Sequence, residues 1–203
     1  MKPCVSMLGA CALLVSGCAM TSKAEPLEVR TFAPPMSAHP AAAKSQAPTR
    51  HLCFGRVSAA AHLRKRMVVR QSPVEIEVYD DRRWAELPSE YARRAIESEL
   101  FHVRGLGEQL ECRSPILDVE LLSFEELAAG RRHEGRVQMQ YVLHDERDVL
   151  FSDTIDVRVP SASEKPEDVA RAIGAALDKA TAQVADGVLR HLPPEVVADT
   201  PAK

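Results

Sequence analysis

The first chemistry that the sequence offers is the acylation of a cysteine near its N-terminus. Lys2 and a short apolar run, residues 5–15, precede Ser16-Gly17-Cys18. A basic start, a short apolar run and small residues before a cleavage point are the parts of a secretory signal. The run is too short for a membrane span, which needs about 20 apolar residues. A cysteine directly after the small residues offers its thiol to diacylglycerol, as in a bacterial lipobox.

We therefore expect cleavage before Cys18, with residues 1–17 as the signal peptide and a lipid on Cys18. Leu8-Gly9-Ala10-Cys11 is a weaker match because less apolar chain precedes it, and an ordinary signal with a chance cysteine is the alternative. One short acyl chain anchors only marginally, so several chains on the same cysteine are needed for a lasting hold. Residue 19 is Ala and not Asp, which by analogy with bacterial sorting favours the periplasmic face of the outer membrane.

Two further cysteines, Cys53 and Cys112, remain in the mature chain. An exported protein sits in an oxidising compartment, so we expect them to pair as a disulfide. The bridge would close a loop of about 60 residues and, on the chain-entropy model, stabilise the fold by about 4 kcal/mol. Two buried free thiols are the alternative.

The other motifs do not predict catalysis. His133-Glu134 lacks the second histidine of a zinc-protease motif, because Val137 stands at that position. Gly105-Leu106-Gly107 lacks the third glycine of a dinucleotide loop, and the seven histidines have no metal-ligand spacing. The net charge of −3 gives no reason to expect nucleic acid as a partner. We expect no enzyme, no metal site and no cofactor.

One basic cluster and the single tryptophan are the candidate docking residues. The cluster suits an acidic partner surface or anionic lipid headgroups, and a solvated loop is the alternative. Trp84 could anchor an interface, although we favour packing of a helix end on the sheet. The basic side chains are Arg64, Lys65, Arg66 and Arg70.

The 203 residues suit one domain with extensions. Residues 18–48 contain five prolines and no sustained apolar period, so they predict a tether after the lipidated cysteine, with a reach of at most about 90 Å. Residues 49–192 form the domain and residues 193–203 a C-terminal tail.

Period-two alternation and proline positions predict the elements of this domain. Val74, Ile76 and Val78 alternate with polar residues and predict a half-buried strand. Helix competes with strand over residues 120–129, which are rich in Glu, Leu and Ala; we choose strand. The expected strands lie at 52–57, 67–70, 74–79, 116–122, 136–143 and 149–159, and the expected helices begin at Pro88 and Pro166.

This order predicts an α+β fold, with a mixed β-sheet and two helices packed on one face as a two-layer sandwich. The other face of the sheet meets water or a partner. Its side chains are mostly charged or amide-bearing: Gln138, Gln140, Asp156 and Arg158.

Four ordered segments behind the lipobox carry a resemblance to a known family. They are Gly55-Arg56-Val57-Ser58-Ala59, Ser72-Pro73-Val74-Glu75, Leu117-Asp118-Val119-Glu120-Leu121 and Asp168-Val169-Ala170-Arg171-Ala172. Over about residues 49–191 the chain resembles the ABC-type transport auxiliary lipoproteins, the family of the paraquat-inducible C-type lipoproteins. The resemblance implies a fold similar to the N-terminal domain of TolB and no catalytic residues.

The family resemblance also implies partners, namely an inner-membrane ABC transporter and its mammalian-cell-entry (MCE) protein, in lipid traffic across the envelope. Our leading hypothesis is a non-catalytic lipoprotein that docks this assembly at the outer membrane. The alternatives are an outer-membrane assembly or structural lipoprotein that binds cell-wall material or other envelope proteins, and a module that carries lipid itself. A ring-like homo-oligomer would suit a symmetric partner.

Overall fold

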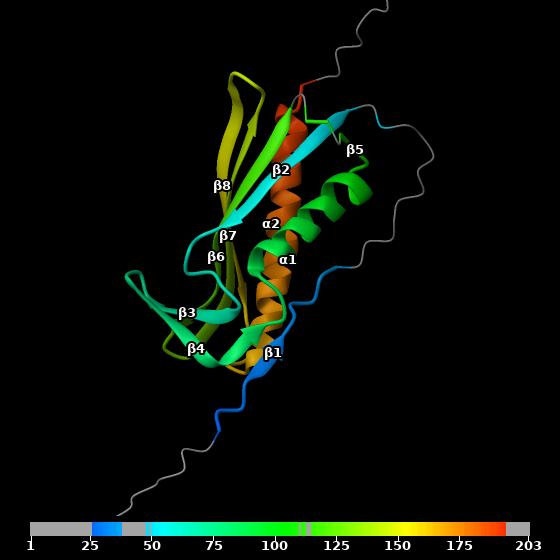
Figure 1. Ribbon diagram of the computed structural model, residues 1–203. Coiled ribbons are helices and arrows are strands. Elements are labelled where there is room, and N and C mark those ends of the chain that lie inside the picture. The colour runs from blue at the N-terminus through cyan, green and yellow to red at the C-terminus, as the bar shows by residue number, and fades with distance from the viewer. Residues whose placement is uncertain (1–25, 38–47, 49, 110, 113–114, 194–203) are drawn as a thin grey trace, which may run out of the picture.

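The computed structural model describes residues 26–37, 48, 50–109, 111–112 and 115–193. Figure 1 shows the order and arrangement of the elements. The helical elements are α1 (Pro88–Glu97), its π-helical continuation η1 (Ser98–Val103) and α2 (Pro166–His191). The strands are β1 (Arg30–Phe32), β2 (His51–Ala59), β3 (Arg66–Ser72), β4 (Glu75–Trp84), β5 (Gly107–Glu108), β6 (Ile116–Ala129), β7 (Arg132–His144) and β8 (Val149–Pro160).

Both helices begin where the sequence predicts, because a proline occupies the first turn of each. Proline has the backbone φ that a helix needs and lacks only an N–H that would be unpaired there. Acidic residues follow in the first turn of each helix and favour the positive end of its dipole. The first helical stretch ends at Gly105, whose φ of +72° suits glycine.

The eight strands form one mixed sheet around β6. Along one side β6 pairs antiparallel with β7, from Ile116 opposite His144 to Ala129 opposite Arg132. Along its other side it pairs in parallel first with β2 and then with β3. The structure confirms the predicted strand, and not a helix, in residues 120–129, because this segment is hydrogen-bonded into the β6–β7 ladder.

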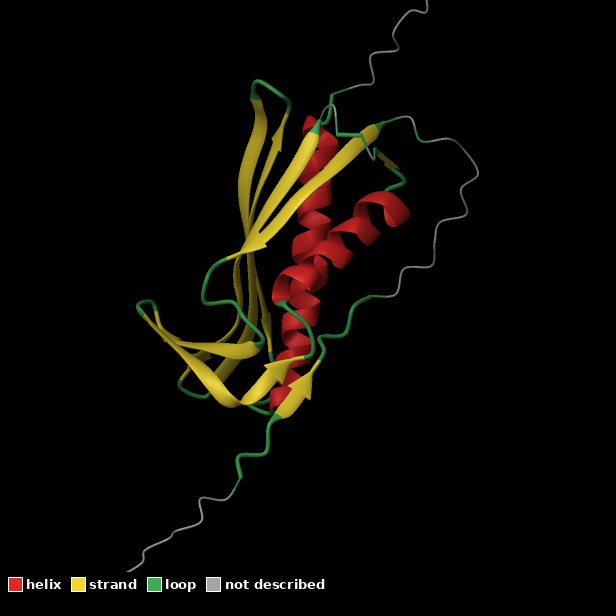
Figure 2. Cartoon of the chain, viewed as in Figure 1, coloured by secondary structure: helices red, strands yellow, loops and turns green. Residues whose placement is uncertain are grey.

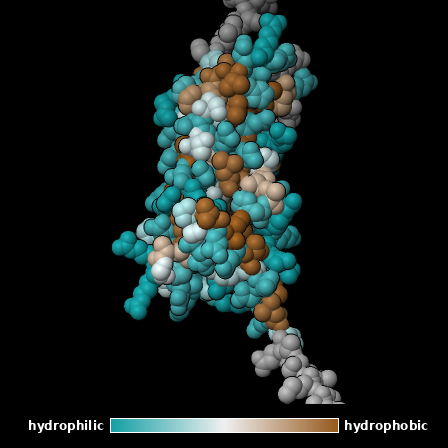
Figure 3. Space-filling model, turned by 90° about the vertical axis from the view of Figure 1, so that its left-hand side faces the viewer, coloured by the Kyte–Doolittle hydropathy of each residue, from teal (hydrophilic) through white to brown (hydrophobic). Residues whose placement is uncertain are grey.

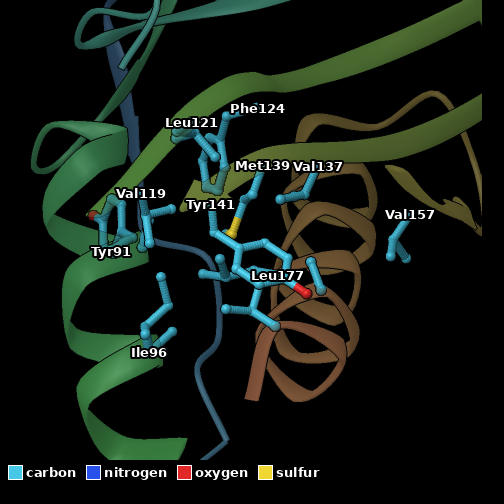
Figure 4. Close-up of a cluster of buried hydrophobic side chains, with 14 of the residues drawn as sticks. Tyr91, Ile96, Val119, Leu121, Phe124, Val137, Met139, Tyr141, Val157 and Leu177 are labelled. Atoms are coloured by element: carbon cyan, nitrogen blue, oxygen red, sulfur yellow. The ribbon is translucent and has the colours of Figure 1, made fainter. Parts of the chain in front are cut away.

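The structure confirms the predicted α+β class. Both helices lie on one face of the sheet and leave the opposite face open (Figure 2). Figure 4 shows the core between these two layers, to which α1 contributes Tyr91 and Ile96, and α2 contributes Leu177. β6 and β7 contribute the alternating residues of their helix-facing sides, all nearly inaccessible to solvent: Val119, Leu121, Phe124, Val137, Met139 and Tyr141.

Part of the segment expected to be a tether is packed on the domain. β1 pairs in parallel with the end of β4, Arg30 opposite Arg82 and Phe32 opposite Trp84. The chain then follows α2, where Ser37 bonds to Asp178 with its hydroxyl. No alternation is visible in residues 30–32, because three paired residues are too few to show a period. Arg30 is 12 residues after Cys18, so even a fully extended chain between them spans at most about 40 Å, compared with the about 90 Å expected for the whole segment 18–48.

Candidate functional site

The open face of the sheet carries a row of polar side chains in fixed cross-strand pairs. Arg136 lies opposite Arg158 and Gln138 lies opposite Asp156 in the β7–β8 ladder. Gln140 follows on the same face and is exposed. This confirms the predicted polar face. Figure 3 looks onto this side and shows separate groups of hydrophobic side chains among hydrophilic ones.

A buried carboxylate, Glu125, organises the lower part of this face. Its side chain is 0% exposed. Arg70 donates to it from Nε at 2.7 Å and from Nη2 at 3.1 Å, so the contact is bidentate. Arg136 donates to the same carboxylate at 3.3 Å. Charge-assisted, two-point contacts of this kind are the stronger class of hydrogen bond and fix geometry.

The network continues from β7 to β8 through Asp156. Arg136 donates to its two oxygens at 2.8 and 2.9 Å. These bonds hold the pKa of Asp156 below its usual value and raise the pKa of Arg136. The open face therefore presents charges whose positions are set by their neighbours before any partner arrives.

A second buried carboxylate, Glu126, points to the helix side, as strand alternation requires. His133 Nδ1 lies 2.5 Å from its Oε1, and the Tyr79 hydroxyl donates to its Oε2 at 2.9 Å. Burial, followed by the nearby negative charge of Glu126, raises the pKa of Tyr79 to about 12. Arg82 stacks over the Tyr79 ring with its guanidinium carbon 3.9 Å from the centroid. His133 is thus a half-buried partner of a carboxylate.

Sequence reasoning missed both glutamates. Two adjacent acidic residues in a predicted buried strand could have revealed them. Because neighbouring side chains in a strand point to opposite faces, one of the two must point towards the core. The helix-like composition of residues 120–129 hid it.

The structure separates the predicted docking residues into three groups. Arg64 and Lys65 are exposed at the loop before β3, and Arg66 beside them binds Asp80 at 2.9 Å. Arg70 is turned into the Glu125 network, so its charge is already matched. Trp84 is 2% exposed.

Trp84 is therefore a core residue, and its docking role is the part of this prediction that the structure corrects. Its ring centroid lies 5.1 Å from that of Phe124 and 6.4 Å from that of Tyr91. It packs the start of α1 on the sheet, which is the interpretation that we favoured.

The β3–β4 hairpin projects from the sheet on the side of the open face (Figure 1). The predicted strand is present, but its apolar side is not covered: Val74 at the tip is 94% exposed, Ile76 38% and Val78 42%. The alternation of these residues showed a two-sided strand and could not show that nothing packs on the apolar side. A hollow of about 410 Å³ lies between the hairpin and the open face and is lined in part by Arg70, Pro73, Leu127, Arg136 and Arg158.

The two cysteines of the folded domain lie together, as expected. Cys53 on β2 and Cys112 in the loop after β5 form a disulfide, with their Cα atoms 5.2 Å apart. Cys18 and residues 1–17, expected to be the signal peptide, lie outside the described residues. Within the described ranges no helix has both the length and the apolar character needed to cross a bilayer. In the same ranges no group of three or more His, Cys, Asp or Glu side chains is placed to hold a metal ion.

Comparisons with known proteins agree on a family and a fold. The model of one family, described as the ABC-type transport auxiliary lipoprotein component, matches residues 32–185. The crystal structure of protein XCC0632 from Xanthomonas campestris is similar at a TM-score of 0.69 and 24% identity, covering 80% of this chain and 96% of that one. The hypothetical protein CT253 from Chlamydia trachomatis is similar at 0.51 and 9% identity, covering 71% and 98%. These two likenesses show the fold, and a comparison with curated proteins finds no match.

Proposed function

We propose, from the premise that the chain belongs to the family of ABC-type transport auxiliary lipoprotein components, that it is a non-catalytic, lipid-anchored subunit of an envelope transport assembly. Cys18 attaches the mature chain to the periplasmic face of the outer membrane. The domain docks an MCE-type protein of an inner-membrane ABC transporter and holds that assembly against the membrane, in lipid traffic.

The observation that carries the docking role is the open face of the sheet. The helices pack on one face, whereas the other presents Arg136, Asp156 and Arg158 in a network held by the buried Glu125. Arginine is enriched in protein interfaces, and side chains that are already ordered lose less entropy on binding. This face thus combines accessibility with pre-organisation.

A matched pair of substitutions tests the docking face. Gln140 on β7 and Gln183 on the outer side of α2 are both exposed glutamines. Gln140→Arg adds bulk and charge to the open face, and Gln183→Arg makes the same change on the helix face. Neither side chain belongs to the core, so both variants should fold with unchanged circular dichroism.

The readout is recovery of an MCE protein with the affinity-tagged chain from membranes in mild detergent. The unchanged chain and Gln183→Arg should recover it, and Gln140→Arg should recover much less. Equal recovery by both variants would move docking away from the open face. Recovery of cell-wall material or of other envelope proteins, with no MCE protein, would favour the structural lipoprotein instead.

A further inference from the structure

We propose that the end of the domain where the chain enters is a membrane-contact surface, with the tip of the β3–β4 hairpin seated in a bilayer that carries anionic lipid. This inference rests on the proposed anchoring at Cys18. It concerns the β3–β4 hairpin and the chain before β1, which adjoin the proposed protein-docking face on β7 and β8 at the hollow beside Arg70.

Exposed apolar side chains gather at this end. Nine large hydrophobic side chains are exposed among the described residues, and five of them lie here. Val74 is the most exposed of all, at 94%, and stands on the turn of a projecting hairpin. Leu27 and Val29, at 60% and 41%, immediately precede β1. Exposed apolar groups on a projecting turn and at the start of the anchored chain suit contact with a lipid interface.

Exposed cations accompany these apolar groups. β3, β4 and β1 are neighbours, with Arg66 opposite Arg83 and Arg83 opposite Thr31. At strand spacings of about 4.8 Å, the basic cluster before β3 therefore lies within roughly 10 Å of the strand that leads to the anchor. Arg64, Lys65 and Arg83 are exposed here. Leu27 and Val29 are the apolar side chains nearest to these cations, and cations at the same end as exposed apolar groups are the pattern that binds anionic headgroups.

The length of chain before β1 keeps this end within reach of the bilayer. Arg30 is 12 residues after Cys18, so it lies within about 40 Å of the acylated residue even if that chain is fully extended. The hairpin tip is about seven β4 residues from the β1 contact, or roughly 23 Å. The bilayer is thus within reach of both.

The opposite end of the domain is much farther from the anchor. The start of β8, with exposed Val149 and Leu150, lies a whole 12-residue strand, or roughly 40 Å, from Pro160 near the start of α2. Glu167 in that first turn of α2 forms an ion pair with Arg30 and ties β1 to it. Val149 therefore provides a control, because it is also an exposed valine but lies at the end of the domain far from β1.

Glu75 and Glu77 do not oppose this seating from the same side. They alternate with Val74, Ile76 and Val78 along β4, so their side chains leave the opposite face of the hairpin. Shallow contact by the turn leaves both carboxylates in water.

Two single-cysteine variants of the acylated mature chain test the proposal. Cys53 and Cys112 are bridged, the lipid would occupy Cys18, and Val74→Cys or Val149→Cys then supplies the one thiol for an environment-sensitive fluorophore. Each is reconstituted on vesicles of phosphatidylethanolamine and phosphatidylglycerol, with and without lipids that carry a spin-label quencher. Vesicles of phosphatidylcholine alone provide the neutral comparison.

We expect the label at 74 to shift to the blue and to be quenched by the spin-labelled lipid, and the label at 149 to stay in water. The effect at 74 should be greater on the anionic vesicles and should weaken in the variant that also carries Arg64→Glu and Lys65→Glu. A chain that floats with the vesicles while the label at 74 stays in water would overturn this proposal and leave the anchor intact.

Two other outcomes count against the proposal. Protection of the label at 74 only after envelope proteins are added would assign the hairpin to a protein partner. A chain that does not float with vesicles at all would overturn both the anchor and the membrane contact that depends on it.

Discussion

Replacing Glu125 by Gln should destabilise the domain by about 3 kcal/mol. The amide keeps the shape of the side chain but removes the charge that Arg70 meets at 2.7 and 3.1 Å. Removing one partner of a buried ion pair costs about 3–5 kcal/mol, because the other charge is left uncompensated. We expect the lower end of this energy range, because the Arg70 side chain is 21% exposed to water and because Arg136 keeps both of its bonds to Asp156.

The assay is urea unfolding at pH 7, followed by the fluorescence of the single tryptophan. Trp84 is buried against Phe124, so its emission reports the loss of the core directly. Since domains are stable by about 5–15 kcal/mol, a loss of this size is a large shift in the unfolding midpoint. The slope should not change, because the folded state buries the same surface.

The double variant Arg70→Met, Glu125→Leu is the control. Replacing both members of a buried pair by apolar side chains is often neutral or stabilising, so it should recover most of the loss. A cost below about 1 kcal/mol for Glu125→Gln, or a double variant no better than the single one, would refute the view that this charge pair is the sensitive element.

Two further predictions concern residues of the β7–β8 ladder. The bonds to Arg136 lower the pKa of Asp156 in the folded state. The ionised Asp156 side chain therefore stabilises the fold above the pKa of an unfolded aspartate, about 3.9, and this stabilisation is lost as the pH falls through the lower pKa of the folded state. Urea midpoints of Asp156→Asn should therefore lie below those of the unchanged chain at pH 7 and approach them below pH 4; a constant gap would contradict this. In β7, Gly135→Ala would place the new Cβ 2.3 Å from Ile173 N and 2.5 Å from Ala172 C, both in the backbone of α2. Because a helix backbone cannot move away at low cost, we expect the free energy of unfolding to fall by about 3 kcal/mol in the same urea assay. An unchanged unfolding midpoint would contradict this close approach.

Local signals were sufficient to predict most of the fold. The prolines at the start of both helices and the alternation in β7 and β8 report the conformation of their own segments, and the structure confirms them. The polar face on Gln138, Gln140, Asp156 and Arg158 follows from the same alternation. None of these inferences requires knowledge of what lies far away in the chain.

The remaining features depend on contacts between distant segments. Whether Val74, Ile76 and Val78 are covered depends on how far the hairpin projects, and β4 alone does not show this. Glu125 is tolerated in a buried strand only because Arg70, 55 residues earlier in the chain, folds onto it. β1 exists because the end of β4 has a free edge, so its three residues carry no pattern of their own.

With the proposed anchor at Cys18, the short strand β1 would be a mechanical weak point between the membrane and the domain. Tension between the membrane and the domain first loads its three residue pairs and the contacts of Ser37 with α2, while the Cys53–Cys112 bridge shields the region that follows. Detachment of this segment as far as Arg50 would lengthen the chain between Cys18 and the folded domain from 12 to 32 residues. Its maximum extension would grow from about 40 to about 110 Å before the main sheet is strained. In a single-molecule pulling experiment this release would be a small early extension that precedes global unfolding. Such a segment would let the domain follow a partner that moves relative to the membrane.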